Sequence, residues 1–214
     1  VVDLSKLTLV PGDSDWRYRS RRSAPGGWTQ VDYNDNDWES GPADLGYGDK
    51  QQTLIGIPPE PKISTVHSYF RHQFTLSRGD INAISNLWLR LKVDDGADVY
   101  LNGVLIHRRN MAEEGQRPLR PVEGLEEDTY FPVDITEHRD LLIPDDANVL
   151  AVSVHNHPEG DNDLTFNLEL LANHLNTDEP TVIAIQQPAD GAYYELGDTI
   201  PISAEAIDPD GEEN

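Results

Sequence analysis

Two histidines separated by one residue are the first group in this sequence that could do chemistry. His155 and His157 stand on either side of Asn156, and Asp161 and Asp163 follow closely. On a β-strand, residues i and i+2 point to the same side, so the two imidazoles could bind one metal ion. A metal hydrolase also needs a further ligand and an activated water, and no other histidine lies in an obvious partner motif. We therefore predict no metal-dependent catalysis from this loop.

Covalent and acid–base catalysis have still less support. The chain has no cysteine, and no serine stands in the Gly-x-Ser-x-Gly turn that exposes a nucleophile. A pair of carboxylates can hydrolyse a glycoside, but no motif singles out such a pair among the 39 Asp and Glu residues. We predict that the chain is not an enzyme, and that it is at most an accessory part of a secreted hydrolase.

Aromatic and arginine residues in the first fifty positions suit carbohydrate binding. A flat ring packs against the C–H groups of a pyranose, while a few polar groups fix its orientation. Trp28 follows two glycines and is the predicted exposed platform, whereas Trp16 and Trp38 are expected to anchor the core. The predicted ligand-binding residues are Trp28, Arg19, Arg21, Tyr47 and His157.

Four arginines lie close together at positions 17, 19, 21 and 22, in a chain with a formal net charge of −23. Two interpretations of this cluster stay open. The arginines could hold the uronate or sulfate group of a ligand, or they could neutralise nearby aspartates.

Loops rich in Asp and Asn make calcium the expected cofactor. Calcium accepts six to eight oxygen ligands in flexible geometry. Three acidic stretches compete, at 32–37, 94–98 and 208–211, and none has the full EF-hand spacing. Each stretch can also be an ordinary polar turn. The predicted metal ligands are Asp35, Asp37, Asp208 and Asp210.

The elements that position these residues are predicted to be β-strands. Apolar residues alternate with polar ones over 87–93 and 97–101, with Asp94-Asp95-Gly96 as the turn between them. Asn102-Gly103 is the strongest short hairpin signal and leads into a return strand at 104–106. We interpret 87–106 as a meander of adjacent strands.

Three further segments read as strands, at 69–76, 149–154 and 164–171, and His72 is expected to be hydrogen-bonded near its strand end. The polar segment 155–163 has the length that joins adjacent antiparallel strands. Helical periodicity is absent, and the best candidate for a helix is a short turn at 80–84.

The composition predicts three regions: a β-sandwich over 1–173, a polar linker over 174–180 and an incomplete segment over 181–214. The last contains two predicted strands, 181–187 and 199–206. Two strands cannot bury a core alone. The segment is therefore a truncated domain, a pair packed on the first domain, or strands that need a partner chain.

The negative charge argues against a nucleic-acid partner or an anionic membrane surface, because both require a cationic face. No stretch is long and apolar enough to span a bilayer. No basic and then apolar leader is present, so an exported protein would have this chain as its mature form.

Several ordered motifs resemble one known family. They are Trp16-Arg17-Tyr18, Asp35-Asn36-Asp37-Trp38, the stretch 41–49, Tyr69-Phe70-Arg71, the stretch 94–103 and the stretch 163–170. Together they resemble the galactose-binding-domain-like jelly rolls that accompany hydrolases and adhesins in secreted bacterial proteins. The resemblance implies an all-β antiparallel jelly-roll sandwich, a framework role for His155 and, often, a structural calcium. The tail is similar to the start of a bacterial immunoglobulin-like repeat, which makes it a partial immunoglobulin-like β segment.

Two hypotheses for function follow. The first is a non-catalytic, extracellular or cell-surface module, bacterial or archaeal, that binds a polysaccharide or another surface polymer beside other domains of a larger chain. The second is a structural subunit or spacer of a stalk, sheath or filament, which self-assembles by strand addition through the C-terminal segment.

Overall fold

The chain divides into two compact units in a computed structural model that describes residues 4–48, 50–56, 67–111, 129–156, 163–175, 182–188 and 192–207. One unit, Asp3–Leu175, is called the sandwich unit below. The other contains β13 (Val182–Gln187) and β14 (Ser203–Ile207), which we call the C-terminal hairpin.

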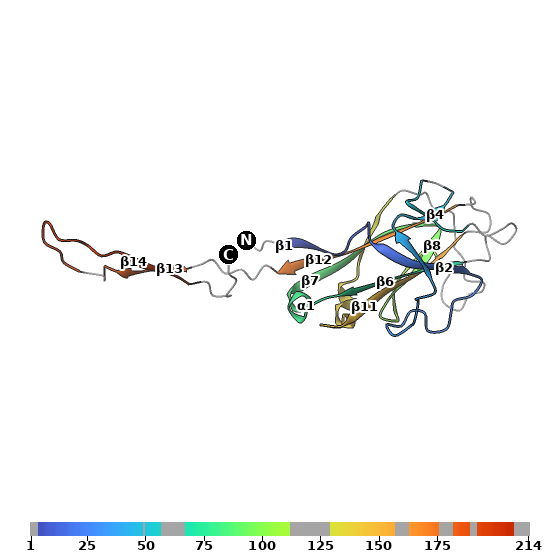
Figure 1. Cartoon of the computed structure of the whole chain (residues 1–214), viewed down its shortest axis with the longest axis horizontal. Helices are drawn as coiled ribbons and strands as arrows, with labels where there is room; N and C mark the ends of the chain where they lie inside the picture. Colours follow the sequence, from blue (N-terminus) through green and yellow to red (C-terminus); the bar gives the residue numbers. More distant parts are fainter. Residues whose placement is uncertain are drawn as a thin grey trace. The chain divides into compact units, whose positions relative to one another are not determined.

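The sandwich unit consists of two six-stranded sheets (Figure 1). Sheet I has the order β10-β7-β12-β4-β5, and β1 also pairs with β12. Its strands are β1 (Leu4–Val10), β4 (Leu45–Tyr47), β5 (Thr53–Leu54), β7 (Ile84–Asp94), β10 (Phe131–Asp134) and β12 (Leu164–Leu175). Only the β4–β5 pair is parallel among the described strand pairs.

Sheet II has the order β3-β2-β6-β11-β8-β9. Its strands are β2 (Asp15–Arg21), β3 (Glu39–Pro42), β6 (His67–Thr75), β8 (Gly96–Leu101), β9 (Val104–Arg109) and β11 (Ala147–His155). The predicted all-β sandwich is confirmed.

The core lies between the two sheets and is built from the alternating apolar positions that the sequence marks. Trp16 is buried there, together with alternate leucines of the two long strands: Leu87, Leu89 and Leu91 of β7, and Leu164, Leu168 and Leu170 of β12. The Phe166 ring lies 4.2 Å from that of Phe70, nearly parallel, and 4.9 Å from that of Trp16, edge to face. Each such side chain contributes about 1.5–3 kcal/mol of burial free energy. Trp16 is therefore a core anchor, as the sequence predicts.

The predicted meander is wrong at its first turn. β7 belongs to sheet I and β8 to sheet II, so residues 94–96 carry the chain from one sheet to the other. The segment after His155 likewise connects β11 of sheet II to β12 of sheet I, which are not neighbours. Each of these strands turns one face toward the core between the sheets, so alternation identifies that face but not the neighbouring strand.

The β8–β9 hairpin is confirmed, with φ angles of 50° at Asn102 and 89° at Gly103 that suit a two-residue turn. The Asn102 side chain also holds the turn in place. Its Nδ2 donates to the Leu141 carbonyl and to Asn148 Oδ1, each at 2.8 Å, and its Oδ1 accepts from the Val149 N–H at 2.7 Å.

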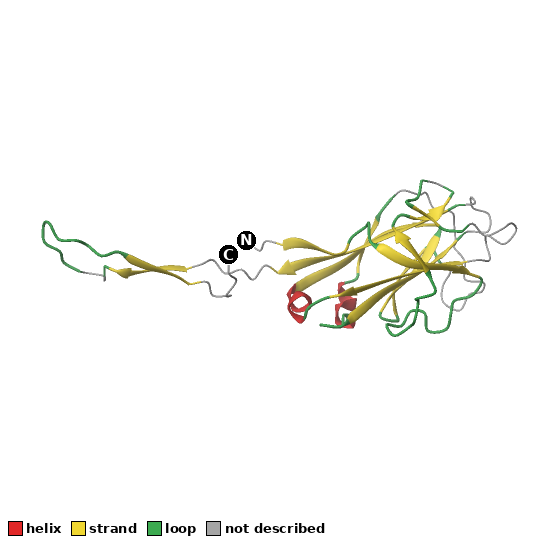
Figure 2. Ribbon diagram, in the orientation of Figure 1, coloured by secondary structure: helices red, strands yellow, loops and turns green. Residues whose placement is uncertain are grey.

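Two short helices lie near each other at one end of the sandwich (Figure 2). α1 (Arg78–Ala83) begins two residues before the predicted turn. A reciprocal capping box starts it, in which Ser77 Oγ accepts from the Asp80 N–H and Asp80 Oδ2 accepts from the Ser77 N–H. The 3-10 helix η2 (Thr136–Leu141) was not predicted. No helix in the described parts is long and apolar enough to cross a membrane.

The C-terminal hairpin contains the two predicted strands, although β14 begins at Ser203 instead of residue 199. Several large apolar side chains in or beside it are exposed: Ile185, Tyr193, Leu196, Ile200 and Ile202. At the other side of the predicted linker, β12 runs on to Leu175, two residues beyond the expected domain boundary. The immunoglobulin-like identity of this unit stays a prediction.

Candidate functional site

A cavity of about 390 Å³ opens on the outer face of sheet II, the face turned away from the core. We call it the sheet II cavity. Its walls come from β6, β8 and β11 and from the loop that follows β2. The lining residues are Arg22, Ser23, Ala24, Trp28, His67, Tyr69, Asp98, Tyr100, Ser153 and His155.

The register of sheet II brings these side chains together. Tyr69 of β6 lies opposite Ser153 of β11, which lies opposite Asp98 of β8. Side chains alternate along each strand, so His67 and His155 emerge on the same face one step further along. Three neighbouring strands thus form a rigid floor with aromatic, hydroxyl, carboxylate and imidazole groups.

Arg71 fixes the loop over this floor. Its side chain is 4% exposed, and its Nε donates to Asp35 Oδ2 at 2.7 Å. The same guanidinium donates to the carbonyls of Trp28, Gln30 (3.1 Å) and Tyr33 (3.5 Å). One buried cation therefore holds residues 28–35, which we call the cover loop, against sheet II.

The structure corrects the prediction for Trp28, which is 7% exposed and is not an open platform. Its ring packs edge to face on Tyr69 at 5.0 Å and on Tyr100 at 5.7 Å. Trp38 lies 6.5 Å away, nearly parallel. Trp38 is buried as expected, but in this outer cluster instead of between the sheets. Trp28 therefore contributes one edge to the cavity wall.

The carboxylate at the cavity is already neutralised. Asp98 is buried and accepts from Arg108 through both oxygens, from Nε at 2.7 Å and from Nη2 at 3.1 Å. This bidentate pair crosses from β8 to β9. It supplies polar surface to the cavity with little net charge.

Two histidine rings form the inner wall. Their centroids are 4.1 Å apart, and His155 Nε2 is 3.0 Å from Ser153 Oγ. Burial, and to a lesser extent positive charge on His67 and Arg108, lowers the pKa of His155 to about 3. Burial also lowers the pKa of His67. Both imidazoles are therefore neutral at pH 7, and neither Nδ1 has a hydrogen-bond partner in the described part of the chain.

The other predicted ligand-binding residues lie in different places. Tyr47 is buried in the core and its hydroxyl accepts from Asn156 Nδ2 at 3.2 Å, so it supports the framework. Burial raises the pKa of Tyr47 to about 12. Arg21 of β2 lies opposite His67, beside the cavity. His157 lies outside the described residues.

Arg19 pairs with Asp37 at 2.6 Å, which supports the neutralising interpretation for this arginine. The hydrogen bond from Arg19 holds the pKa of the Asp37 carboxyl below its usual value. Asp35 is engaged by Arg71. Because a guanidinium beside a carboxylate repels a cation, these two aspartates do not fit calcium. Asp208 and Asp210 lie outside the described residues.

No group of three or more His, Asp or Glu side chains in the described ranges could hold a metal ion. His67 and His155 face each other without a carboxylate ligand beside them, since Asp98 is held by Arg108.

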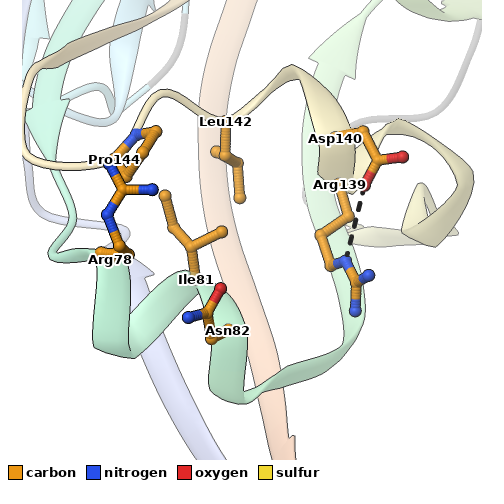
Figure 3. Close-up of a pocket in the computed structure, with 7 residues that line it drawn as sticks. All are labelled: Arg78, Ile81, Asn82, Arg139, Asp140, Leu142 and Pro144. Carbon is orange, nitrogen blue, oxygen red and sulfur yellow. Dashed lines mark ion pairs between the residues drawn. The ribbon is translucent and has the colours of Figure 1, made fainter.

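A second cavity of about 390 Å³ lies between α1 and η2 (Figure 3). Ile81, Leu142 and Pro144 form an apolar floor there. Arg78 lies 3.6 Å from Asp145, and Arg139 lies 3.9 Å from Asp140, as the dashed line in Figure 3 marks for the second pair. No aromatic ring lines it. We therefore take the sheet II cavity as the candidate site.

Comparison with known proteins identifies the fold. No protein-family model matches the chain, and no curated protein matches it in sequence. Among solved structures, a β-glucuronidase from Ruminococcus gnavus in complex with D-glucuronic acid is 14% identical, with a TM-score of 0.51. The match covers 95% of this chain and 34% of that enzyme.

A calcium-binding mutant of β-glucuronidase 2 from Bacteroides uniformis is 18% identical, with a TM-score of 0.50. This match covers 86% of the chain and 21% of the enzyme. The chain thus spans a fifth to a third of the length of these enzymes, and it resembles a domain-sized β-sandwich part of them.

Replacing Arg71 should unfold the protein more easily. Arg71→Met keeps the apolar stem but removes the donor to Asp35 and to the carbonyls of Trp28 and Tyr33, so we expect a loss of about 3 kcal/mol in the free energy of unfolding. Arg19→Met, which breaks the exposed pair with Asp37, should cost less than about 1 kcal/mol. Urea denaturation followed by tryptophan fluorescence measures both. Equal losses in the two variants would contradict the central role of Arg71.

The free energy of unfolding should fall as the solution is acidified. The native pKa of His155 is about 3 and the unfolded value is 6.5, so below pH 6.5 only the unfolded state takes up the proton. The loss from this group is about 1.4 kcal/mol per pH unit between 6.5 and 3. Urea denaturation at pH 7 and pH 5 should show a smaller pH effect in His155→Gln than in His138→Gln, a histidine of η2. Identical pH effects in the two variants would refute this assignment.

Proposed function

We propose that the sandwich unit is a non-catalytic, galactose-binding-domain-like module that binds carbohydrate in the sheet II cavity. One observation carries the proposal. A single concave site combines the rings of Tyr69 and Tyr100 and the edge of Trp28 with the polar side chains of Ser153 and Asp98. Aromatic walls with a few fixed polar groups are the composition that saccharide sites use.

The rigidity of the site supports a binding role. Its floor consists of paired strands, and Arg71 fastens the cover loop. A preorganised surface loses little conformational freedom when a ligand binds. The volume of about 390 Å³ lies at the lower end of the range for ligand pockets, which suits one or two sugar rings at a time.

The comparisons support the proposal that this chain is an accessory domain of a larger protein. The chain resembles only a domain-sized part of bacterial glycoside hydrolases, at an identity that speaks for the fold alone. We propose a bacterial or archaeal protein that is secreted or held at the cell surface, where polysaccharides and other domains of the same chain are the partners.

Calcium is kept as a proposal for the acidic stretch that contains Asp208 and Asp210, which lies outside the described residues. Oxygen ligands at alternate positions of a turn suit this ion. In contrast, Asp35 and Asp37 are occupied by arginines. The binding measurements below are therefore made both with calcium and with a chelator.

Loss of the Tyr100 ring should weaken carbohydrate binding. We expect Tyr100→Ala to lower retention in affinity gels containing neutral or acidic polysaccharides by about tenfold, since stacking and burial of one ring is worth about 1–3 kcal/mol. Tyr193→Ala, which removes an exposed ring from the other unit, is the control and should bind normally. No retention of the wild-type protein on any polysaccharide, with or without calcium, would remove the binding function.

A second function is supported by the C-terminal hairpin. Among the described strands, β13 and β14 pair only with each other, and large apolar side chains in or beside them are exposed, which favours assembly with other copies by strand addition. We propose a stalk, sheath or filament subunit as the alternative to the binding module.

If the chain assembles, its molar mass in solution should rise with protein concentration. Light scattering after size exclusion should show oligomers of the wild-type chain and monomers of Ile185→Lys, because the charge would be buried at the new interface. Leu54→Lys is a matched control, since both side chains are 70% exposed and Leu54 belongs to the sandwich unit. A wild-type chain that stays monomeric at all concentrations would exclude assembly.

A further inference from the structure

We propose that the sheet II cavity selects anionic saccharides, and that Arg21 and Arg22 hold their carboxylate or sulfate groups. This inference rests on the proposed binding function and adds the class of ligand. It follows from the position of two arginines that form no ion pair with a described carboxylate, in a chain whose net charge is −23.

The arginines of the cluster differ in their surroundings. Arg17 donates to the Trp38 carbonyl at 3.3 Å, and Arg19 is paired with Asp37. Arg21 and Arg22 are exposed and form no ion pair within the described part of the chain. Of the arginines in this cluster, Arg22 lines the cavity itself, and Arg21 precedes it at the end of β2.

The strand register places Arg21 beside the site, and the cavity lining includes Arg22. Arg21 lies directly opposite His67, a wall residue, so their Cβ atoms are about 5 Å apart. Arg22 lines the cavity itself. Both side chains are long enough to reach a ligand that rests against Tyr69 and Tyr100.

The other groups of the cavity add no free negative charge. Asp98 is the one carboxylate among the lining residues, and both of its oxygens accept from Arg108. Burial keeps His67 and His155 neutral at pH 7. Among the described lining residues, the site therefore carries the positive charge of Arg22 and no unpaired carboxylate.

The chemistry of the pair suits planar and tetrahedral oxyanions. A guanidinium donates two parallel hydrogen bonds to a carboxylate or a sulfate, and two neighbouring guanidinium groups repel each other until an anion lies between them. Neutral sugars give the same ring contacts with the aromatic wall but leave this repulsion in place. The cavity should therefore bind uronates or sulfated sugars more tightly than their neutral counterparts.

Isothermal titration with three matched ligands tests this inference: a β-1,4-glucan hexamer, the same hexamer oxidised at C6 to the uronate, and the same hexamer sulfated at O6. We expect at least one anionic form to bind roughly tenfold more tightly than the neutral hexamer, as charge-assisted hydrogen bonds require. The difference between the two anions tells a carboxylate site from a sulfate site.

Two variants make the test specific. In Arg21→Gln/Arg22→Gln the preference for the anionic forms over the neutral hexamer should shrink to within about twofold. Arg78→Gln, at the other cavity, should keep the full preference. Raising the salt concentration should weaken anion binding more than neutral binding.

Each outcome has one meaning. Equal binding of all three hexamers by the wild type overturns the inference and leaves the binding function standing. A preference that survives in Arg21→Gln/Arg22→Gln also overturns it, because other groups would then hold the anion. Absence of binding to every hexamer and every polysaccharide removes the inference together with the proposed function.

Discussion

The buried guanidinium of Arg71 is the interaction on which the outer half of this molecule depends. A charge removed from water is costly unless every donor finds an acceptor. Here the acceptors come from the cover loop, as the Asp35 carboxylate and the carbonyls of Trp28, Gln30 and Tyr33. Breaking any of these contacts exposes the others, so the loop and the strand are stable only together. The aromatic cluster and one wall of the sheet II cavity exist because this loop is closed.

The sequence was informative wherever a local rule determines the structure. Alternating side chains identify the buried face of β7 and β12, and the left-handed turn of Asn102-Gly103 identifies a hairpin. No such local rule determines which of the two sheets a strand joins. The turn at residues 94–96 looks like a hairpin turn, yet it changes sheets, because in a sandwich both strands bury one face whichever sheet they join.

The site was harder to predict than the fold for a related reason. Tyr69, Tyr100 and Ser153 stand at positions that face away from the core, and an outward polar position usually faces solvent. Only the strand order shows that they share one surface. Trp28 was misplaced because two preceding glycines suggest an open loop, whereas a distant arginine in β6 binds its carbonyl and buries its ring. The signal that could have found the site is a run of outward aromatic and hydroxyl residues on several strands at once.

The hydrogen bonds of Asn102 restrict which residues can replace it in evolution. Asn-Gly and Asp-Gly both adopt the backbone angles of a two-residue hairpin turn, so the turn alone does not require asparagine. Here the amide nitrogen of Asn102 donates to Asn148 Oδ1, and its oxygen accepts from the Val149 N–H. An aspartate would place a second acceptor against the Asn148 oxygen. Homologues are therefore expected to substitute positions 102 and 148 as a pair, which makes their covariation a marker for descent of this hairpin.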